Sequence, residues 1–122
     1  KRLVIELETP DLVVFLVHLS LGTRVRTRQL ADLYDLVRNT HKPLIVAGDF
    51  NTLWGEHEIR LFLAATGLAN ANTQTLPSFP SWAPKRHLDF ILHSPEIRIR
   101  EFRMPKILLS DHLPLICDFE LT

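Results

Sequence analysis

The sequence has little that is typical of a secreted or membrane-bound protein. It contains a single cysteine, Cys117, so no disulfide can form within one chain. This thiol lies in an apolar run, where we expect it to be buried and inert. No apolar stretch approaches the roughly 18 to 20 residues of a membrane-spanning helix, and no signal-peptide pattern is found. The single cysteine and the missing signal pattern favour a cytoplasmic location.

The chain also lacks a net charge, because 14 Lys and Arg residues balance 14 Asp and Glu residues. No long-range electrostatic field therefore draws it to nucleic acid or to an anionic membrane, although a local basic patch is compatible with this balance. The basic residues Arg98, Arg100, Arg103 and Lys106 interleave with or follow a strand pattern. We interpret them as the solvated face of an edge strand rather than as a track for nucleic acid.

The overall composition is that of an ordinary globular domain. Of the 122 residues, 46% are hydrophobic and 23% are charged, which fits a single domain over residues 1–122. Because the first residue is a lysine, we expect the chain to be a fragment or a processed product.

Alternating β and α patterns predict a layered α/β (α+β) domain. Helices are expected at residues 23–39 and 56–66, where apolar residues recur every three or four positions. Thr23 or Thr27 is expected to cap the first helix, and Gly67 to end the second. Residues 68–85 are rich in Asn, Thr, Ser and Pro and are expected to form a loop. Strands are expected at residues 2–9, 12–17, 43–47, 88–93, 97–104 and 113–121.

The most informative motif is the Gly-Asp-Phe-Asn sequence at residues 48–51, which follows a buried-strand pattern. Asp49 and Asn51 share strand parity, so both side chains leave the strand end on the same side. The carboxylate can bind a metal or orient a water, and the amide can donate to an anionic oxygen. This pair suits phosphoester chemistry, in which positioning and charge neutralisation dominate. The structural alternative is that these residues cap a helix.

Three further polar positions lie beside apolar strand patterns. His18 ends one run, Asp89 lies near the start of another, and Asp111 and His112 directly precede the last. Each has a plain structural alternative. His18 can be an ordinary polar residue at a strand end, Asp111 can cap a turn, and Asp89 can form a surface ion pair with Arg86.

Taken together and in this order, these motifs resemble those of the endonuclease/exonuclease/phosphatase superfamily, also called DNase I-like. The family carries a histidine after a strand, then G-D-x-N, then R-x-D-x-I-L, then S-D-H-x-P; here the counterparts are His18, residues 48–51, 87–92 and 110–114. One departure is His87, which stands where the family often has arginine. The early asparagine and the metal-binding glutamate of the family are missing. The chain therefore resembles the C-terminal half only.

The resemblance implies half of a four-layer α/β/β/α sandwich, with one mixed sheet of about five to six strands and two helices on one face. It also implies a phosphodiesterase or phosphomonoesterase that uses Mg²⁺ or Mn²⁺, ions that prefer oxygen ligands. The implied substrates are nucleic acid, inositol phosphates or phospholipid headgroups. The implied partner on the open sheet face is a second copy or a missing half.

Each motif residue has an implied role. Asp49 orients the attacking water and binds metal, and Asp111 is a metal-side carboxylate. Asn51 and His18 bind the phosphate, and His18 is also a candidate second acid. Asp89 orients His112, which acts as acid or base. Trp82 is a candidate substrate-binding residue, the alternative being that it packs beneath its own loop.

A non-catalytic role is the rival hypothesis. A truncated relative that retains this half of the fold would serve as a binding or self-association module. The missing glutamate motif favours this alternative. A largely apolar, uncovered sheet face would drive self-association in either case.

Overall fold

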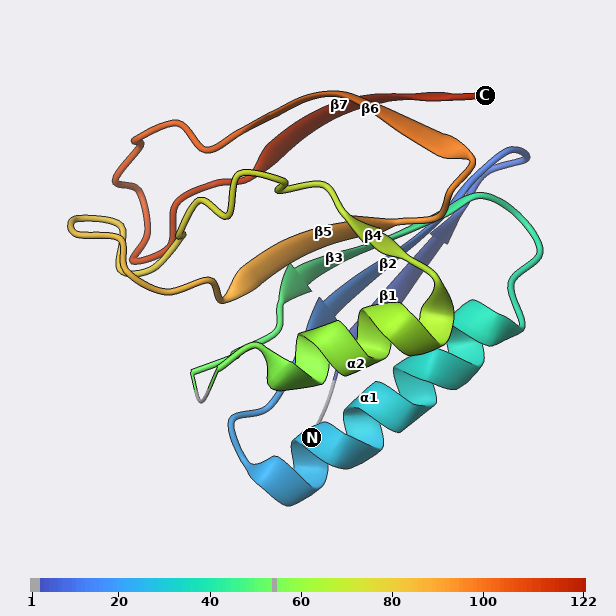
Figure 1. Cartoon of the computed structure of the whole chain (residues 1–122), viewed down its shortest axis with the longest axis horizontal. Helices are drawn as coiled ribbons and strands as arrows, with labels where there is room; N and C mark the ends of the chain where they lie inside the picture. The colour runs from blue at the N-terminus through green and yellow to red at the C-terminus, as the bar shows by residue number, and fades with distance from the viewer. Residues whose placement is uncertain (1–2, 54) are drawn as a thin grey trace.

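Residues 3–53 and 55–122 are described by the computed structural model, and within them the chain forms three layers (Figure 1). Two helices lie on one face of a five-stranded sheet, and a two-stranded sheet lies on the other side. The helices are α1 (Thr23–Arg38) and α2 (His57–Thr66). The strands are β1 (Leu3–Glu8), β2 (Val13–His18), β3 (Leu44–Asp49), β4 (Ala69–Asn70), β5 (Asp89–His93), β6 (Ile97–Arg103) and β7 (Ile116–Leu121).

The main sheet is mixed and has the order β1-β2-β3-β5-β4, which confirms the predicted mixed sheet with two helices on one face. Strands β2 and β3 are parallel, and α1 makes the crossover between them. Strands β1 and β5 pair antiparallel with β2 and β3, respectively. The short strand β4 lies in the segment that was expected to be a loop. Strands β6 and β7 pair with each other in a second sheet and do not extend the first.

The hydrophobic core lies between the main sheet and the helices. Alternate residues of β2 are buried on this side, with Phe15 at its centre, and Leu33 of α1 packs in the same cluster. Beyond the end of β3, the ring of Phe50 meets that of Phe90 edge to face, with ring centroids 5.4 Å apart. The buried Phe50 therefore anchors the segment that carries the Gly-Asp-Phe-Asn motif.

The ends of the helices agree only in part with the prediction. Gly67 ends α2 in the left-handed conformation (φ 77°), as predicted. The N-cap of α1 is Gly22, and no side chain caps it. The expected cap by Thr23 or Thr27 is therefore wrong. Thr27 instead donates its hydroxyl to the Thr23 carbonyl, one turn earlier in the helix.

The second sheet has one apolar and one charged face. Ile97 is buried, whereas Arg98 and Arg100 lie on the exposed face, within ion-pair distance of Glu120. Both arginines are exposed, as expected for a solvated strand face, where ion pairs contribute little stability. Cys117 is half-buried rather than fully buried. Partial burial and the nearby charge of Asp118 raise the pKa of the thiol. The raised pKa favours the protonated thiol, which is less reactive than the thiolate.

The face of the main sheet opposite the helices is only partly covered. Ile45 of β3 lies on that face and is 6% exposed. The second sheet, β6 and β7, lies on the same side of the main sheet (Figure 1). On β1 and β2, by contrast, Ile5, Leu7 and Leu16 are 44%, 53% and 38% exposed. An apolar face is thus open at the β1 edge of the sheet. Among the described residues, no helix is long and apolar enough to cross a membrane.

We predict that Gly48→Ala strongly destabilises the fold. Gly48 has φ +142°, and a Cβ atom there would lie 1.9 Å from the Val17 carbonyl oxygen, a backbone atom of the paired strand. Denaturant titration should give a loss of about 2 kcal/mol or more in the free energy of unfolding. Gly22→Ala is the control, because a Cβ atom at Gly22 would have no neighbouring atom within 4 Å. Equal losses in both variants would contradict this account of Gly48.

Candidate active site

Strand register brings three of the predicted residues to one end of the main sheet. His18 at the end of β2 pairs with Asp49 at the end of β3, and Asp49 pairs with Asp89 at the start of β5. Residues in register share a face of the sheet. Because Val17 is buried toward the helices, its neighbour His18 and the two aspartates lie on the opposite face.

A short polar contact joins this group to His112, as the predicted bond between Asp89 and His112. His112 Nδ1 donates to Asp89 Oδ2 over 2.6 Å. The buried Ser78 hydroxyl donates to the same oxygen, also over 2.6 Å. The ring of Phe79 lies against the imidazole, with centroids 4.9 Å apart. The orientation of His112 is therefore fixed by a carboxylate on one side and an aromatic ring on another.

Backbone hydrogen bonds hold the His112 segment against the loop before β5. Leu113 donates to the Ser78 carbonyl and Ser81 donates to the Asp111 carbonyl, each over 2.8 Å. The Ser81 hydroxyl also donates to the Ser110 carbonyl. These contacts bring residues about 30 positions apart in sequence into one rigid corner beside the sheet.

Asp49 lies at the centre of the group. Its Oδ2 atom is 3.5 Å from His18 Nε2 and 3.8 Å from His112 Nε2. Its other oxygen, Oδ1, accepts the backbone N–H of Asn51 over 2.8 Å. Asp49 and His18 thus converge at the same end of the sheet, as predicted.

Asn51 turns the chain sharply after β3. It has a positive φ of 50°, a conformation that asparagine tolerates better than most residues. Its side-chain Nδ2 donates to the Leu19 carbonyl over 2.6 Å, which joins the loops after β2 and β3. The alternative in which this motif caps a helix is wrong, because α2 begins only at His57 and its N-cap is Glu56.

Burial and neighbouring charges perturb two of these groups. Burial raises the pKa of Asp49, and the nearby charge of Asp89 adds to this, against the lowering effects of the Asn51 N–H and the two histidines. Burial alone lowers the pKa of His112. The hydrogen bond to Asp89 and the charges of Asp89, Asp49 and Asp111 outweigh burial and raise this pKa.

One group of donors has the spacing of a metal site. Ligand atoms of Asp49, Asp89 and His112 all lie within 4.8 Å of one another. Asp111, the other predicted metal ligand, is exposed and outside this group, with its Oδ1 accepting from the Ser110 hydroxyl. Two carboxylates fit a divalent cation that prefers oxygen, but they supply few of the roughly six ligands that Mg²⁺ needs.

Some contacts were not expected from the sequence. Ser78 and Phe79 contact the Asp89–His112 pair, yet nothing in their local pattern distinguishes them from other loop residues. His87, which stands where the family often has arginine, donates its Nε2 hydrogen to the Thr75 carbonyl, and its Nδ1 is 2.9 Å from Glu56 Oε2. The alternative in which Trp82 packs under its own loop is wrong, because its side chain is 69% exposed.

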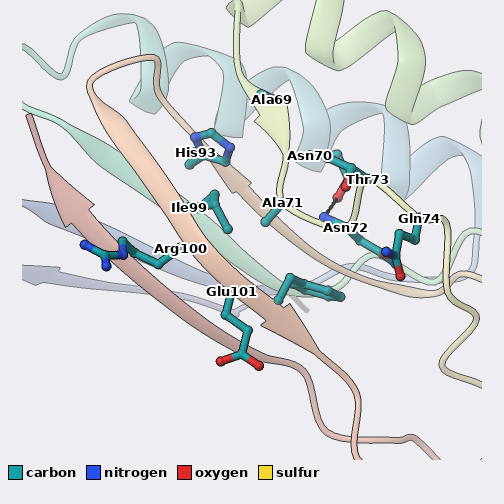
Figure 2. A pocket seen from close by; sticks show the side chains of 11 residues that line it. Ala69, Asn70, Ala71, Asn72, Thr73, Gln74, His93, Ile99, Arg100 and Glu101 are labelled. Carbon is teal, nitrogen blue, oxygen red and sulfur yellow. Dashed lines mark hydrogen bonds between the residues drawn. The ribbon is translucent and has the colours of Figure 1, made fainter.

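A cavity of about 430 Å³ lies elsewhere, between β4 and β6 (Figure 2). It is lined by His93, at the end of β5 away from Asp89, and by residues of β6 such as Ile99 and Arg100. This cavity does not include the cluster of Asp49, Asp89 and His112.

The motif residues and their geometry match a known family. The model of the Endonuclease/Exonuclease/phosphatase family aligns with residues 2–112 of the chain, a range that contains every residue of the cluster. The chain belongs to this family. This family is part of a superfamily of phosphoesterases and nucleases, and the chain carries the Asp/Asp/His cluster described above.

Related proteins are longer than this chain. A UPF0294 protein of Vibrio cholerae is 32% identical over 112 residues, which are 86% of this chain and 37% of that protein. A UPF0294 protein of Vibrio parahaemolyticus is 29% identical over 115 residues, 88% of this chain and 38% of the relative. The chain spans less than two fifths of these family relatives.

Solved structures share the fold. A mannosyl-6-phosphatase of Bacteroides thetaiotaomicron superposes with a TM-score of 0.73 at 17% identity, over 90% of this chain and 51% of that one. The human Nocturnin catalytic domain with bound sulfate anion superposes with a TM-score of 0.67 at 26% identity, over 91% of this chain and 47% of that one. This chain therefore corresponds to about half of each of these two structures, as the motifs predicted.

We predict that His112 titrates above its ordinary value of 6.5, because the charge and hydrogen bond of Asp89 favour the imidazolium. NMR titration of the imidazole should show this, and Asp89→Asn should lower the pKa. Protonation then favours the folded state. The stability that it contributes is fully present below about pH 6.5 and is lost as pH rises through the raised folded-state pKa. A wild-type pKa at or below 6.5 would contradict the pairing.

Proposed function

We propose that this chain is the C-terminal part of a metal-dependent phosphoesterase whose hydrolytic site includes the Asp89–His112 pair. The observation that carries the proposal is the 2.6 Å hydrogen bond of this pair, with His112 Nε2 turned toward Asp49 at 3.8 Å. An imidazole fixed by a carboxylate, facing a second carboxylate, is an arrangement suited to proton transfer during hydrolysis.

Asp49 and Asp89 are the residues that would hold the divalent cation, Mg²⁺ or Mn²⁺, with Asp111 as a neighbouring carboxylate. When bound, such a cation neutralises phosphate charge. Asp89 Oδ2 already accepts from Ser78 and His112, so Asp49 Oδ2 is the more available oxygen. Further ligands would come from water and from the rest of a longer protein.

The remaining groups have distinct roles in the proposal. Asp49 accepts a hydrogen bond from the attacking water and orients it. His112 Nε2 gives or takes the proton, while Asp89 holds the ring in the tautomer with Nδ1 protonated. Asn51 uses one amide hydrogen on the Leu19 carbonyl and has a second for a phosphate oxygen. The imidazole of His18 is 67% exposed and is placed to contact substrate.

The proposed substrate is a phosphoester in a nucleic acid, an inositol phosphate or a phospholipid headgroup. Two structurally similar proteins, a mannosyl-6-phosphatase and a Nocturnin catalytic domain with bound sulfate, are consistent with a tetrahedral anion as the ligand of this site. Zero net charge argues against strong electrostatic binding of duplex DNA. The exposed Trp82 is a proposed stacking surface for a base or a wall for the leaving group.

We predict that in a longer protein containing this chain, Asp89→Asn and Asp49→Asn each lower hydrolysis by at least about 100-fold, because each removes a group that acts on protons or water. The assay is release of nitrophenol from bis(4-nitrophenyl) phosphate and 4-nitrophenyl phosphate with Mg²⁺ or Mn²⁺. Asp118→Asn, at an exposed position of β7, is the matched control. Full activity in Asp89→Asn would refute the assigned role of the pair.

By itself, the chain should bind Mg²⁺ weakly and hydrolyse these substrates poorly or not at all. The cluster offers two carboxylates and one imidazole, whereas Mg²⁺ keeps its waters unless carboxylates are well placed around it. Isothermal calorimetry should give a millimolar or weaker dissociation constant. Tight binding by the isolated chain would contradict this expectation and would point to ligands supplied by a second copy.

The second candidate function, a self-association or binding module, rests on the open apolar face. Ile5, Leu7 and Leu16 are more than a third exposed on β1 and β2, and Phe119 and Leu121 of β7 are similarly exposed. We propose that a second copy or the remaining half of a longer protein covers this face. Sedimentation of the isolated chain at micromolar concentration tests it, and a stable monomer would exclude the homodimer.

A further inference from the structure

Two polar side chains of α1 are buried against the loops that follow β2 and β3. Arg26 is 2% exposed and Gln29 is 4% exposed, and they lie one turn apart on the same face of the helix. Neither was expected from the sequence to be buried. A buried arginine is costly unless its charge and its five donors are satisfied, so the contacts that satisfy Arg26 are informative.

Arg26 binds the backbone of both loops that carry the proposed site. Its Nη1 atom donates to the Ser20 carbonyl over 2.9 Å, in the loop after β2. The same nitrogen also donates to the carbonyls of Phe50, over 2.5 Å, and Asn51, over 3.2 Å, in the loop after β3. One guanidinium thus spans the segments that follow His18 and Asp49.

Gln29 completes this arrangement from the next turn of α1. Its Oε1 atom accepts the backbone N–H of Ser20 over 2.8 Å, so both polar backbone groups of Ser20 are bound by α1. Leu19, in turn, accepts from the Asn51 side chain and donates to the Asp49 carbonyl. Hydrogen bonds through Ser20 and Leu19 therefore connect α1 to Asp49 and Asn51, the two polar residues of the Gly-Asp-Phe-Asn motif.

A charge from α2 holds the guanidinium in place. Arg26 Nε and Nη2 both donate to Glu58 Oε1, over 3.0 and 2.5 Å. With Nη1 on the loop carbonyls, every nitrogen of the guanidinium has an acceptor, and its planar shape fixes their relative directions. The ion pair thus ties both helices to the loops beside the site.

We propose that Arg26, fixed by Glu58 and assisted by Gln29, is a positioning residue that sets Asn51 and Asp49 in register with His18. This inference rests on the proposed function for its effect on catalysis. Arg26 itself lies on the helix side of the loops and acts through their backbone, not on substrate. Its removal takes a donor from three loop carbonyls, of which that of Asn51 keeps only the Leu53 N–H, so the left-handed turn at Asn51 loses support.

The structural part of the test is hydrogen exchange followed by NMR. It uses the folded chain and does not require that the chain hydrolyse a phosphoester. Arg26→Lys and Glu58→Gln should each speed exchange at least 10-fold at the backbone amides of Ser20 and Asn51. Exchange at Val46, in the buried centre of β3, should change far less. Arg28→Lys, an exposed position on the same helix, is the matched control and should leave all three amides unchanged.

The kinetic arm uses a longer, active protein. Arg26→Met should lower kcat by about 100-fold with little change in KM, because misplacing catalytic groups by about 1 Å is costly to the reaction. Arg26→Lys should recover part of this loss, since lysine keeps the charge but offers a single point donor. Glu58→Gln should lower kcat less than Arg26→Met, and Arg28→Lys should match the wild type.

The two arms separate failure of this inference from failure of the proposed function. If the wild type hydrolyses no phosphoester, exchange at Ser20 and Asn51 still decides the role of Arg26. Unchanged exchange at these amides in folded Arg26→Lys and Glu58→Gln would overturn the inference. Equal acceleration at Val46 would also overturn it, because Arg26 would then act only on global stability. If Arg26→Met does not fold, the lysine and Glu58→Gln variants carry the test.

Discussion

The hydrogen bond between Asp89 and His112 is the contact on which the candidate site depends. Asp89 is fixed at the start of β5 by its register with Asp49, while His112 lies in an irregular segment that has no strand of its own. The 2.6 Å bond, with Ser78 on the same oxygen, joins this segment to the sheet. Backbone hydrogen bonds hold the segment itself, and this bond fixes the direction of the imidazole, whose Nε2 is turned toward Asp49.

The parts of the fold that could be predicted are those with local periodicity or a specific motif. Apolar spacing predicted both helices and the strands that end at His18 and Asp49, and Gly67 was recognised as a helix end. The Asp89–His112 contact was predicted from the family resemblance, which implies that this aspartate orients this histidine. Strand parity and register then explain why His18, Asp49 and Asp89 meet at one end of the sheet.

The remainder depended on contacts between distant segments. Helical spacing places Arg26 on the same face as Leu33 and Val37, but no local pattern signals that an arginine can be buried there. Its burial depends on Glu58 and on loop carbonyls that only tertiary structure brings near. Likewise, the strand patterns of β6 and β7 could not reveal that these strands form a sheet of their own. Strand patterns predict pairing capacity, not the partner.

The most direct test of the central claim is the pH dependence of kcat/KM in a longer, active protein, compared with its Asp89→Asn variant. If His112 is the proton-transferring group, one limb of the profile reports its pKa, and that pKa is raised by the Asp89 carboxylate. We predict that this limb moves to lower pH in Asp89→Asn while residual activity remains measurable. A limb at the same pH in both proteins would contradict it.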